Sequence, residues 1–308
     1  MICKLCPRNC NIDRTESAGF CGATEVVRLA KADVFEWEEP CISGTKGSGA
    51  IFFSGCNLKC CFCQNYEISS GFFGKDISVK RLAEIFKELE QKGVHNINLV
   101  SPTHYAFQII EAIKIYKPKI PIVWNSNGYE KVETIKMIEP FVDIFLVDLK
   151  FYNDYLSSKY CKATNYFQNA SAVIKEMTKS KPKLIYKNDI LQNGVIIRHL
   201  VMPNCTKDSI NILDWLSKNI KTEFLLSLMG QYTPYHKAQE HPEINRKLKP
   251  IEYKIVIEKA KELGLENGYI QELESGDEKY IPIWDLKGVW PKFSNINKFW
   301  KYIQKIAI

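Results

Sequence analysis

The cysteines are the residues of this sequence most suited to chemistry. The chain has 308 residues and eleven cysteines, of which only Cys161 and Cys205 lie beyond residue 63. An odd number of cysteines cannot all pair as disulfides, and closely spaced cysteines in an intracellular chain are typical of metal ligands. We therefore expect metal centres in the first fifth of the chain rather than a disulfide framework.

One group of cysteines has the spacing of a catalytic cluster. Cys56, Cys60 and Cys63 form C-x3-C-x2-C within SGCNLKCCFCQN (54–65). Three thiolates on one short loop can hold three irons of a [4Fe–4S] cubane and leave the fourth iron open to a small molecule. A protein that only relays electrons would supply a fourth cysteine. The neighbouring Cys61 is expected to be a buried thiol outside the ligand set.

A second group of cysteines lies at the N-terminus. Cys3, Cys6, Cys10 and Cys21 form C-x2-C-x3-C-x10-C, and four thiolates in so short a segment can complete a zinc site or an auxiliary iron–sulfur cluster. A zinc ribbon usually has two C-x2-C pairs, whereas only one is present here, which slightly favours the cluster. Cys41 stands alone and is expected to be a packed thiol.

The elements that must position these cysteines alternate along the chain. We predict a strand at 50–53, followed from residue 78 by helices and strands in turn, which is typical of a parallel α/β fold. Predicted helices cover 79–92, 105–116, 132–138, 167–177, 210–220 and 253–263, and predicted strands cover 97–100, 120–124, 142–149, 195–202 and 224–229. Residues 26–40 could pair as short strands, 192–194 is predicted to be a turn, and 38–48 and 230–250 are predicted linkers.

This pattern predicts an α/β fold, a partial (β/α)6 TIM-like barrel with a small cysteine-rich metal-binding extension. The expected divisions are the extension (1–45), the barrel (46–250) and a C-terminal helical and strand extension packed on the barrel (251–308). In such folds the chemistry gathers where the parallel strands end. The cysteine triplet follows the first predicted strand, so we expect it at this edge.

The triplet, with Phe62 just before its last cysteine, resembles the radical S-adenosylmethionine (SAM) superfamily. The nearest likeness is to pyruvate formate-lyase activating enzyme and its relatives. The resemblance implies an oxidoreductase in which the open iron binds the amino and carboxylate groups of SAM and Phe62 packs near the adenine. It also implies reductive cleavage of SAM to a 5′-deoxyadenosyl radical, with flavodoxin or ferredoxin as reductant.

Three further segments resemble those activating enzymes. Asn125–Tyr129 is similar to their Asp-Thr-Asn-Gly-aromatic segment, Asp148–Lys150 to their Asp-Leu-Lys, and Arg198–Pro203 to their Arg-x-x-Val-x-Pro. The likeness implies cofactor-binding roles for Asn125, Ser126, Asp148, Lys150 and Arg198. In the family the first two segments help to bind a monovalent cation. Here Asn125 replaces an Asp, which removes one negative charge from that place.

The sequence departs from the superfamily after the second predicted strand of the barrel. A Gly-Gly-Glu stretch usually grips the amino group of SAM there, but this chain has Val100–His104. Ser101, Thr103 and His104 offer polar groups that could replace the missing Glu, and Thr103 could equally be a helix N-cap. The departure indicates a divergent branch, so the substrate cannot be carried over from the activating enzymes.

Composition sets the remaining limits. The net charge of +7 is explained either by lysine-rich solvated helix faces or by a surface for a nucleic acid. No apolar run of about 18 residues could span a membrane and no secretory leader is visible, so we expect a cytoplasmic protein with no membrane partner.

Three functions remain open at this point. The first is a radical enzyme that activates or modifies a protein or peptide. The second is a radical enzyme that modifies RNA or a small metabolite, and the third is an iron–sulfur or zinc protein without enzymatic activity. Gln231–His236, Glu272 and Glu274 are either substrate-binding residues at the barrel mouth or ordinary polar loop residues. His199 is expected to be a satisfied core histidine.

Overall fold

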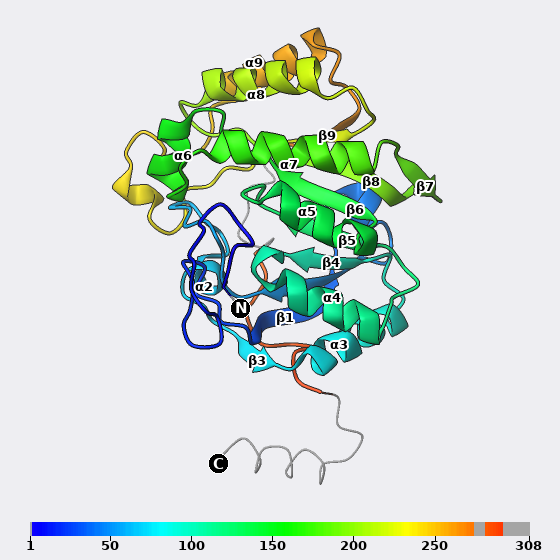
Figure 1. Cartoon of the computed structure of the whole chain (residues 1–308). Coiled ribbons are helices and arrows are strands. Elements are labelled where there is room, and N and C mark those ends of the chain that lie inside the picture. Colours follow the sequence, from blue (N-terminus) through cyan, green and yellow to red (C-terminus); the bar gives the residue numbers. More distant parts are fainter. Residues whose placement is uncertain (1, 274–280, 292–308) are drawn as a thin grey trace.

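A single mixed sheet organises the computed structural model, which describes residues 2–273 and 281–291 (Figure 1). Within this part of the chain the strand order is β10-β9-β8-β6-β5-β4-β2-β1-β3, and β7 pairs with β8. The strands are β1 (Val27–Phe35), β2 (Ser48–Phe53), β3 (Lys75–Ile77), β4 (Ile97–Val100), β5 (Ile122–Ser126), β6 (Ile144–Asp148), β7 (Ile185–Lys187), β8 (Ile190–Leu200), β9 (Leu225–Met229) and β10 (Gly268–Ile270). Strands β2, β4, β5, β6, β8 and β9 pair in parallel, as a partial (β/α)6 barrel requires.

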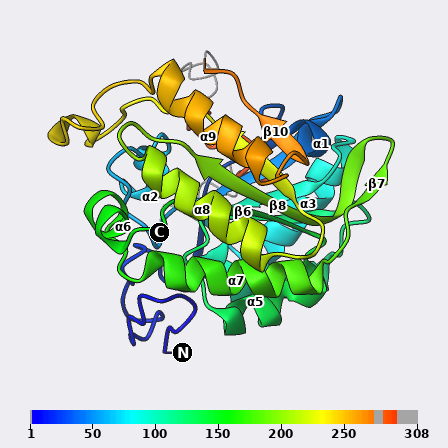
Figure 2. The same cartoon turned by 90° about the horizontal axis from the view of Figure 1, so that it is seen from above.

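Helices cover the outer face of this curved sheet (Figure 2). The helices are α1 (Pro40–Ser43), α2 (Tyr66–Ser69), α3 (Val79–Gln91), α4 (Ala106–Ile115), α5 (Val132–Ile138), α6 (Asp154–Cys161), α7 (Tyr166–Ser180), α8 (Thr206–Asn219) and α9 (Pro250–Glu262). Helix α3 shows why the sequence folds in this way. The Ser78 side chain accepts the Arg81 N–H at its N-terminus, and Leu82, Phe86 and Leu89 bury one face against the sheet.

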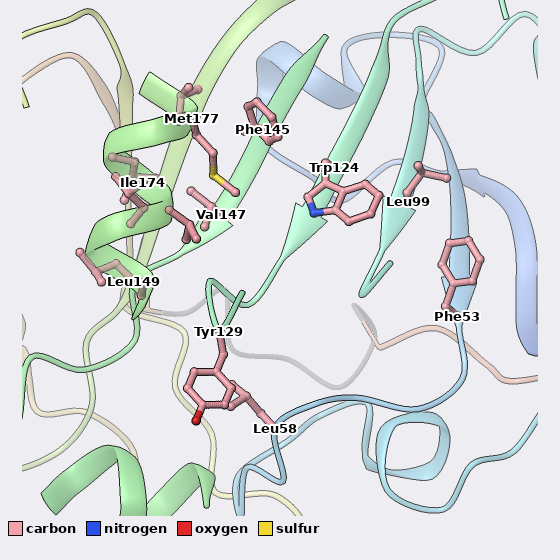
Figure 3. Packing of buried hydrophobic residues seen from close by; sticks show 14 of the residues in the cluster. Phe53, Leu58, Leu99, Trp124, Tyr129, Phe145, Val147, Leu149, Ile174 and Met177 are labelled. Carbon is pink, nitrogen blue, oxygen red and sulfur yellow. The ribbon is translucent and has the colours of Figure 1, made fainter. Parts of the chain in front are cut away.

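The main core lies between the sheet and these helices. Figure 3 shows Phe145 and Val147 of β6 beside Ile174 and Met177 of α7, with Trp124 of β5 farther along the sheet. All five side chains are fully buried. Each such side chain contributes about 1.5–3 kcal/mol relative to leaving it in water, so this layer fixes the ends of the strands that carry the site.

A second, smaller core closes the barrel at the end opposite the carboxyl ends of the parallel strands. Cys41 and Ile42 of α1 pack inside the sheet against Val123, Ile196 and Leu225, and all five are buried. Residues two apart on a strand face the same side of the sheet. The inward-facing residues in this layer are apolar, and those in the next layer, nearer the carboxyl ends of the strands, are polar. Cys41 is therefore a packed thiol, as predicted.

The predicted fold class is confirmed, but several local predictions were wrong. Residues 192–194 lie inside β8, where the φ of +145° at Gly194 is compatible with a strand, and the turn instead uses Asn188 and Asp189 in the left-handed region. The linker prediction for 38–48 missed α1 and the start of β2, and the sequence reading missed α6 and β7. Among the described residues, no helix is long and apolar enough to cross a membrane.

Candidate functional site

The loop that follows β2 carries the cysteine triplet and is held in place through its backbone. The N–H groups of Cys56, Lys59 and Cys61 donate to the carbonyls of Cys21, Cys161 and Tyr160, at 3.2, 3.1 and 2.8 Å. Thus the N-terminal segment and the end of α6 both pin the loop.

A glycine allows the chain to enter this loop. Gly55 has a φ of +92°, and a Cβ added there would lie 2.6 Å from the Cys21 carbonyl oxygen. Only glycine combines this φ with so close an approach of two backbones.

The three cysteines of the triplet are half-buried and lie close together. Burial, together with the charge of Cys60, raises the pKa of Cys56 to about 12 and that of Cys63 to about 11. The Asn127 amide donates to Cys56 Sγ at 3.3 Å, and Cys63 Sγ lies 3.3 Å from Ser69 Oγ. Thiols in this setting lose their protons when a metal replaces them, so the donor set fits an iron–sulfur cluster.

Cys161, at the end of α6, is a neighbour of the triplet that no sequence pattern predicts. Its Sγ lies 3.1 Å from Cys60 Sγ, and this contact, followed by burial, raises the pKa of Cys60 well above its usual range. Cys161 is 101 residues away in sequence, and its spacing matches no ligand motif. Only the fold brings the two sulfurs together.

Polar side chains at the ends of β6 and β8 form an ion-paired cluster beside the triplet. Arg198 donates to Asp148 at 2.8 Å and to Asn125 at 2.7 Å, and Lys150 donates to Asp148 at 2.7 Å. Burial acts to raise the pKa of Asp148, but Arg198 and Lys150 outweigh it and hold that pKa below its usual range. These four predicted cofactor-binding residues therefore lie together, and Asp148 stays ionised between the two cations.

A pocket of about 230 Å³ opens between this charged cluster and the cysteine loop. Its walls include Cys60, Cys63, Phe62, Asp148, Lys150 and Arg198, all of which were predicted from the sequence. Phe62 is buried, with its ring 5.8 Å from Tyr232 and 6.4 Å from Phe151. A pocket with one aromatic wall and several charges suits a ligand such as SAM, which has a ring at one end and a zwitterion at the other.

Glu130, which the sequence analysis missed, accepts hydrogen bonds from two of the predicted cofactor-binding residues, Thr103 and Ser126. This fully buried carboxylate accepts from Thr103 Oγ1 at 2.8 Å, Trp124 Nε1 at 2.9 Å and Ser126 Oγ at 2.6 Å. The structure thus uses the hydroxyls of Thr103 and Ser126 to join the ends of β4 and β5. The signal that could have revealed it is a Glu directly after Asn-Ser-Asn-Gly-Tyr.

Ser101 and His104 have different surroundings. Ser101 sits in the left-handed region with a φ of +57°, at the end of β4, and its N–H donates to the Asn125 carbonyl. His104 Nε2 lies 2.8 Å from the Ser54 carbonyl oxygen, so this nitrogen must carry the proton. Burial lowers the pKa of His104 to about 3, which keeps the ring neutral behind the cysteine loop.

The four N-terminal cysteines converge on one another. A Cβ at Gly19 would lie 3.5 Å from Cys10 Sγ and 3.6 Å from Cys21 Sγ, so these two sulfurs flank the same residue. After burial, the charges of Cys3 and Cys10 add to the raised pKa of Cys21. Burial likewise raises the pKa of Cys6 to about 12, with smaller contributions from Cys21 and Cys3.

Asn57 connects this N-terminal group to the triplet. Its side chain hydrogen-bonds Cys6 and accepts from Asn127 Nδ2 at 2.8 Å, and the same Asn127 amide reaches Cys56 Sγ. Arg8 also donates to the Asn57 carbonyl at 2.9 Å. In the part of the chain that the structure describes, no three Cys, His, Asp or Glu side chains are arranged to hold a single metal ion.

The remaining predicted residues divide between the pocket and the surface. Gln231, Tyr232 and Thr233 line the pocket, whereas His236 stacks on Tyr66 with ring centroids 4.7 Å apart. Glu272 is exposed, and Glu274 lies outside the described residues. His199 is a core residue, as predicted, because its two ring nitrogens meet the Leu149 carbonyl and Ser209 Oγ.

Three cysteines after the first parallel strand, with a charged pocket at the carboxyl ends of the others, define the class of barrel that holds an open iron–sulfur cluster beside a small cofactor. Comparisons with known proteins agree with this class. The family model described as "Radical SAM superfamily" matches residues 50–216. The chain therefore belongs to the radical SAM superfamily, whose members are enzymes that cleave SAM at a [4Fe–4S] cluster.

Two proteins of Methanocaldococcus jannaschii are similar over most of their length. The uncharacterized protein MJ0674 is 34% identical over 285 residues, which cover 86% of this chain and 75% of that protein. The uncharacterized protein MJ0808 is 24% identical over 308 residues, covering 93% and 81%.

A solved structure shares the fold. The crystal structure of Streptococcus suis SuiB bound to the precursor peptide SuiA has a TM-score of 0.51 and 15% identity. The match covers 72% of this chain and 48% of that chain, so this protein spans about half the length of SuiB. The likeness shows the shared α/β barrel architecture.

Proposed function

We propose that this protein is a radical SAM enzyme that modifies or activates a protein or peptide. The observation that carries the proposal is the pocket beside the triplet, which continues into a larger cavity of about 360 Å³ inside the barrel. The two share Gln64, Asn65, Arg198 and Gln231 as walls. A cofactor at the triplet and a substrate group in the barrel would therefore occupy adjoining pockets.

The residues around the pocket have separable tasks. When bound, the cluster and SAM supply an electron and a reactive adenosyl group. Cys56, Cys60 and Cys63 would hold the cluster. Phe62 would pack against the adenine, and the charges of Asp148, Lys150 and Arg198 would orient the zwitterion. Because these charges are already paired and buried, they need little rearrangement when the ligand enters.

Two features support a protein or peptide as substrate. The residue segments 125–129, 148–150 and 198–203 resemble those of glycyl-radical activating enzymes; the last two line the pocket, and Asn125 of the first accepts a hydrogen bond from Arg198 there. In addition, SuiB, which shares the fold, was solved with a precursor peptide bound. The alternative is an RNA substrate, which the net charge of +7 suggests. Binding of tRNA that weakens steeply with rising salt would favour this alternative.

The N-terminal cysteines support a second centre. We propose that Cys3, Cys6, Cys10 and Cys21 hold an auxiliary iron–sulfur cluster. The four cysteines converge, and Asn57 connects them to the triplet. This connection favours a cluster that exchanges electrons with the triplet over a structural zinc. Iron, sulfide and zinc analysis with electron paramagnetic resonance decides between them, since two clusters give about eight irons and no zinc.

Production of 5′-deoxyadenosine tests the proposed chemistry. The anaerobically reconstituted, dithionite-reduced protein should form it from SAM, and Cys60→Ala should abolish it because two thiolates do not retain the cubane. Cys61→Ala is the matched control, since Cys61 is adjacent in sequence to Cys60. Its N–H and carbonyl make backbone hydrogen bonds, which alanine would keep. Wild-type turnover in Cys60→Ala, or equal loss in both variants, would show that the ligand assignment is wrong.

A peptide screen tests the substrate class. Purified candidate peptides and glycyl-radical partner proteins are incubated with the reduced enzyme and SAM, and radical signals and mass changes are recorded. Modification of RNA or of a metabolite, with none of any peptide, would reject the protein substrate and leave SAM cleavage intact.

A further inference from the structure

Two adjacent carboxylates, Glu38 and Glu39, lie inside the barrel although the segment reads as a polar linker. Glu38 follows β1 and lines the larger cavity, and Glu39 precedes α1, whose Cys41 and Ile42 close the barrel from below. The Glu38 side chain is 8% exposed, and Glu39 is 5% exposed. Carboxylates are seldom buried in this way without a partner of opposite charge.

Glu38 has partners that leave its charge only partly compensated. Its carboxylate accepts from Asn98 at 2.9 Å and from Asn125 at 3.2 Å, and Arg198 Nη1 reaches it at 3.3 Å. The amides carry no charge, and Arg198 makes its shorter contact, 2.8 Å, with Asp148. Burial, opposed by Arg198, raises the pKa of Glu38 to about 7, which agrees with a carboxylate that lacks a full counter-charge.

Glu39 is the second, independent observation. Its Oε2 is buried and has no hydrogen-bond partner among the described residues. The carboxylate lies close enough to Arg198 to help raise the pKa of that guanidinium. A buried ionised oxygen without a donor costs several kcal/mol unless a ligand supplies one.

Other unpartnered oxygens in the same layer are able to accept hydrogen bonds. Asn98 Oδ1 and Ser227 Oγ are fully buried and have no partner in the described part of the chain. Asn98 faces the interior because its amide contacts Glu38, and Ser227 lies beside Arg198 in the β8–β9 register. On the cavity wall, Gln271 Oε1 is likewise unpartnered. A ligand that satisfies these atoms must bring donors.

The balance of charges in this interior also favours a cationic ligand. The carboxylates of Glu38, Glu39 and Asp148 face the cations Arg198 and Lys150, so three negative charges meet two positive ones, and both cations are already paired with Asp148. One negative charge remains without a partner in this group.

The apolar walls of the cavity suit an organic cation. Phe35, Trp37 and Phe52 line it, with the rings of Phe35 and Phe52 edge to face at 5.7 Å. Aromatic faces attract ammonium and guanidinium groups, and they also cover the alkyl chain that carries such a group.

We propose that the barrel interior binds an ammonium or guanidinium group of the substrate on Glu38 and Glu39, between the aromatic wall and the cofactor pocket. The inference rests on the proposed function in that this cavity is taken as the substrate site. The cation enters at the carboxyl ends of the strands, because the apolar layer of α1 closes the opposite end. Its source is either a lysine or arginine side chain of a peptide or a free amine.

Direct binding tests this proposal without turnover. The reconstituted full-length protein is titrated with cadaverine and with 1,5-pentanediol, which have similar length and shape but differ in charge, and affinity is measured by ligand-detected NMR. Cadaverine should bind at least about tenfold more tightly than the diol. Equal affinities would overturn the proposal, whatever the result for SAM cleavage.

Substitutions then locate the site. Glu39→Gln keeps the shape and removes the charge, and it should weaken cadaverine binding about tenfold or more while leaving diol binding as it was. Glu38→Gln gives an independent second variant. Glu258→Gln, on the exposed face of α9, is the matched control and should bind as the wild type does. Unchanged cadaverine affinity in both cavity variants would refute the assignment of these two carboxylates.

Two peptides distinguish the sources of the cation. Ac-Gly-Lys-Gly-NH2 and its acetyl-lysine counterpart are compared by the same NMR titration. Tighter binding of the lysine peptide than of cadaverine supports a peptide side chain, and cadaverine binding with no peptide binding supports a free amine. Formation of 5′-deoxyadenosine is measured on the same preparation, so that failure of the proposed chemistry is seen separately from failure of cation binding.

Discussion

Glu130 offers the sharpest test of how the site is built. Replacement by Ala removes its three buried hydrogen bonds, from Thr103, Trp124 and Ser126, and leaves three donors without partners. At about 1 kcal/mol for each bond and about 1 kcal/mol for the space left behind, the variant should lose about 4 kcal/mol of unfolding free energy. That is a large part of the 5–15 kcal/mol typical of a domain.

Glu130→Gln should be far milder. The remaining amide oxygen can keep the bonds from Thr103 and Trp124, which both reach Oε1, and the new amide group can donate to Ser126 Oγ. Burial also raises the pKa of Glu130, which shows that the interior disfavours its charge, and Gln does not carry that penalty. We therefore expect a loss of about 1 kcal/mol or less.

Urea unfolding under anaerobic conditions, on preparations of equal iron content, measures these differences. Glu133→Ala is the control, because Glu133 is exposed in the first turn of α5 and should contribute about 0.5 kcal/mol. A loss under about 1 kcal/mol for Glu130→Ala, or equal losses for Ala and Gln, would refute the view that this carboxylate joins β4 to β5.

Two further predictions concern the backbone of the cluster loop and the acid stability of the sheet edge. Gly55→Ala should destabilise the protein by about 2 kcal/mol or more and lower its iron content on reconstitution, because of the positive φ and the clash with Cys21; unchanged iron content would contradict it. Burial acts to raise the pKa of Asp33, but Lys287 and Lys92 lower it to about 2, so its stabilisation is present above pH 4 and lost as the pH falls toward 2. Asp33→Asn should therefore cost about 1 kcal/mol at pH 6 and much less at pH 2 in urea unfolding, and an equal cost at both pH values would exclude this origin.

The sequence was sufficient for those parts of the site that depend on local spacing. The triplet and the pair Asp148 and Lys150 end predicted strands, so their position at the carboxyl edge followed from the α/β alternation. Likewise, α3 could be predicted because its apolar residues recur at helical spacing.

Other parts of the site depend on contacts that no local pattern encodes. Cys161 meets Cys60 because α6 folds back over the cluster loop, and Glu130 meets Thr103 because β4 and β5 are neighbours. Glu38 and Glu39 fall in a predicted linker, 38–48. Their burial results from α1 entering the barrel, which no period in the sequence reveals.

Arg198 explains why the test of the cation site relies on glutamate variants. Its guanidinium donates to Asp148 beside the cofactor pocket and to Glu38 on the cavity wall, so it joins the two halves of the interior. Removing it would leave Glu38 without a cationic partner and Asp148 with Lys150 alone, a change that costs about 3–5 kcal/mol and alters the cofactor pocket as well. A loss of binding in such a variant would have several causes. Glu39, with an unpartnered oxygen, can lose its charge without breaking an existing hydrogen bond at that atom, so its substitution disturbs the cofactor pocket less than removal of Arg198 would.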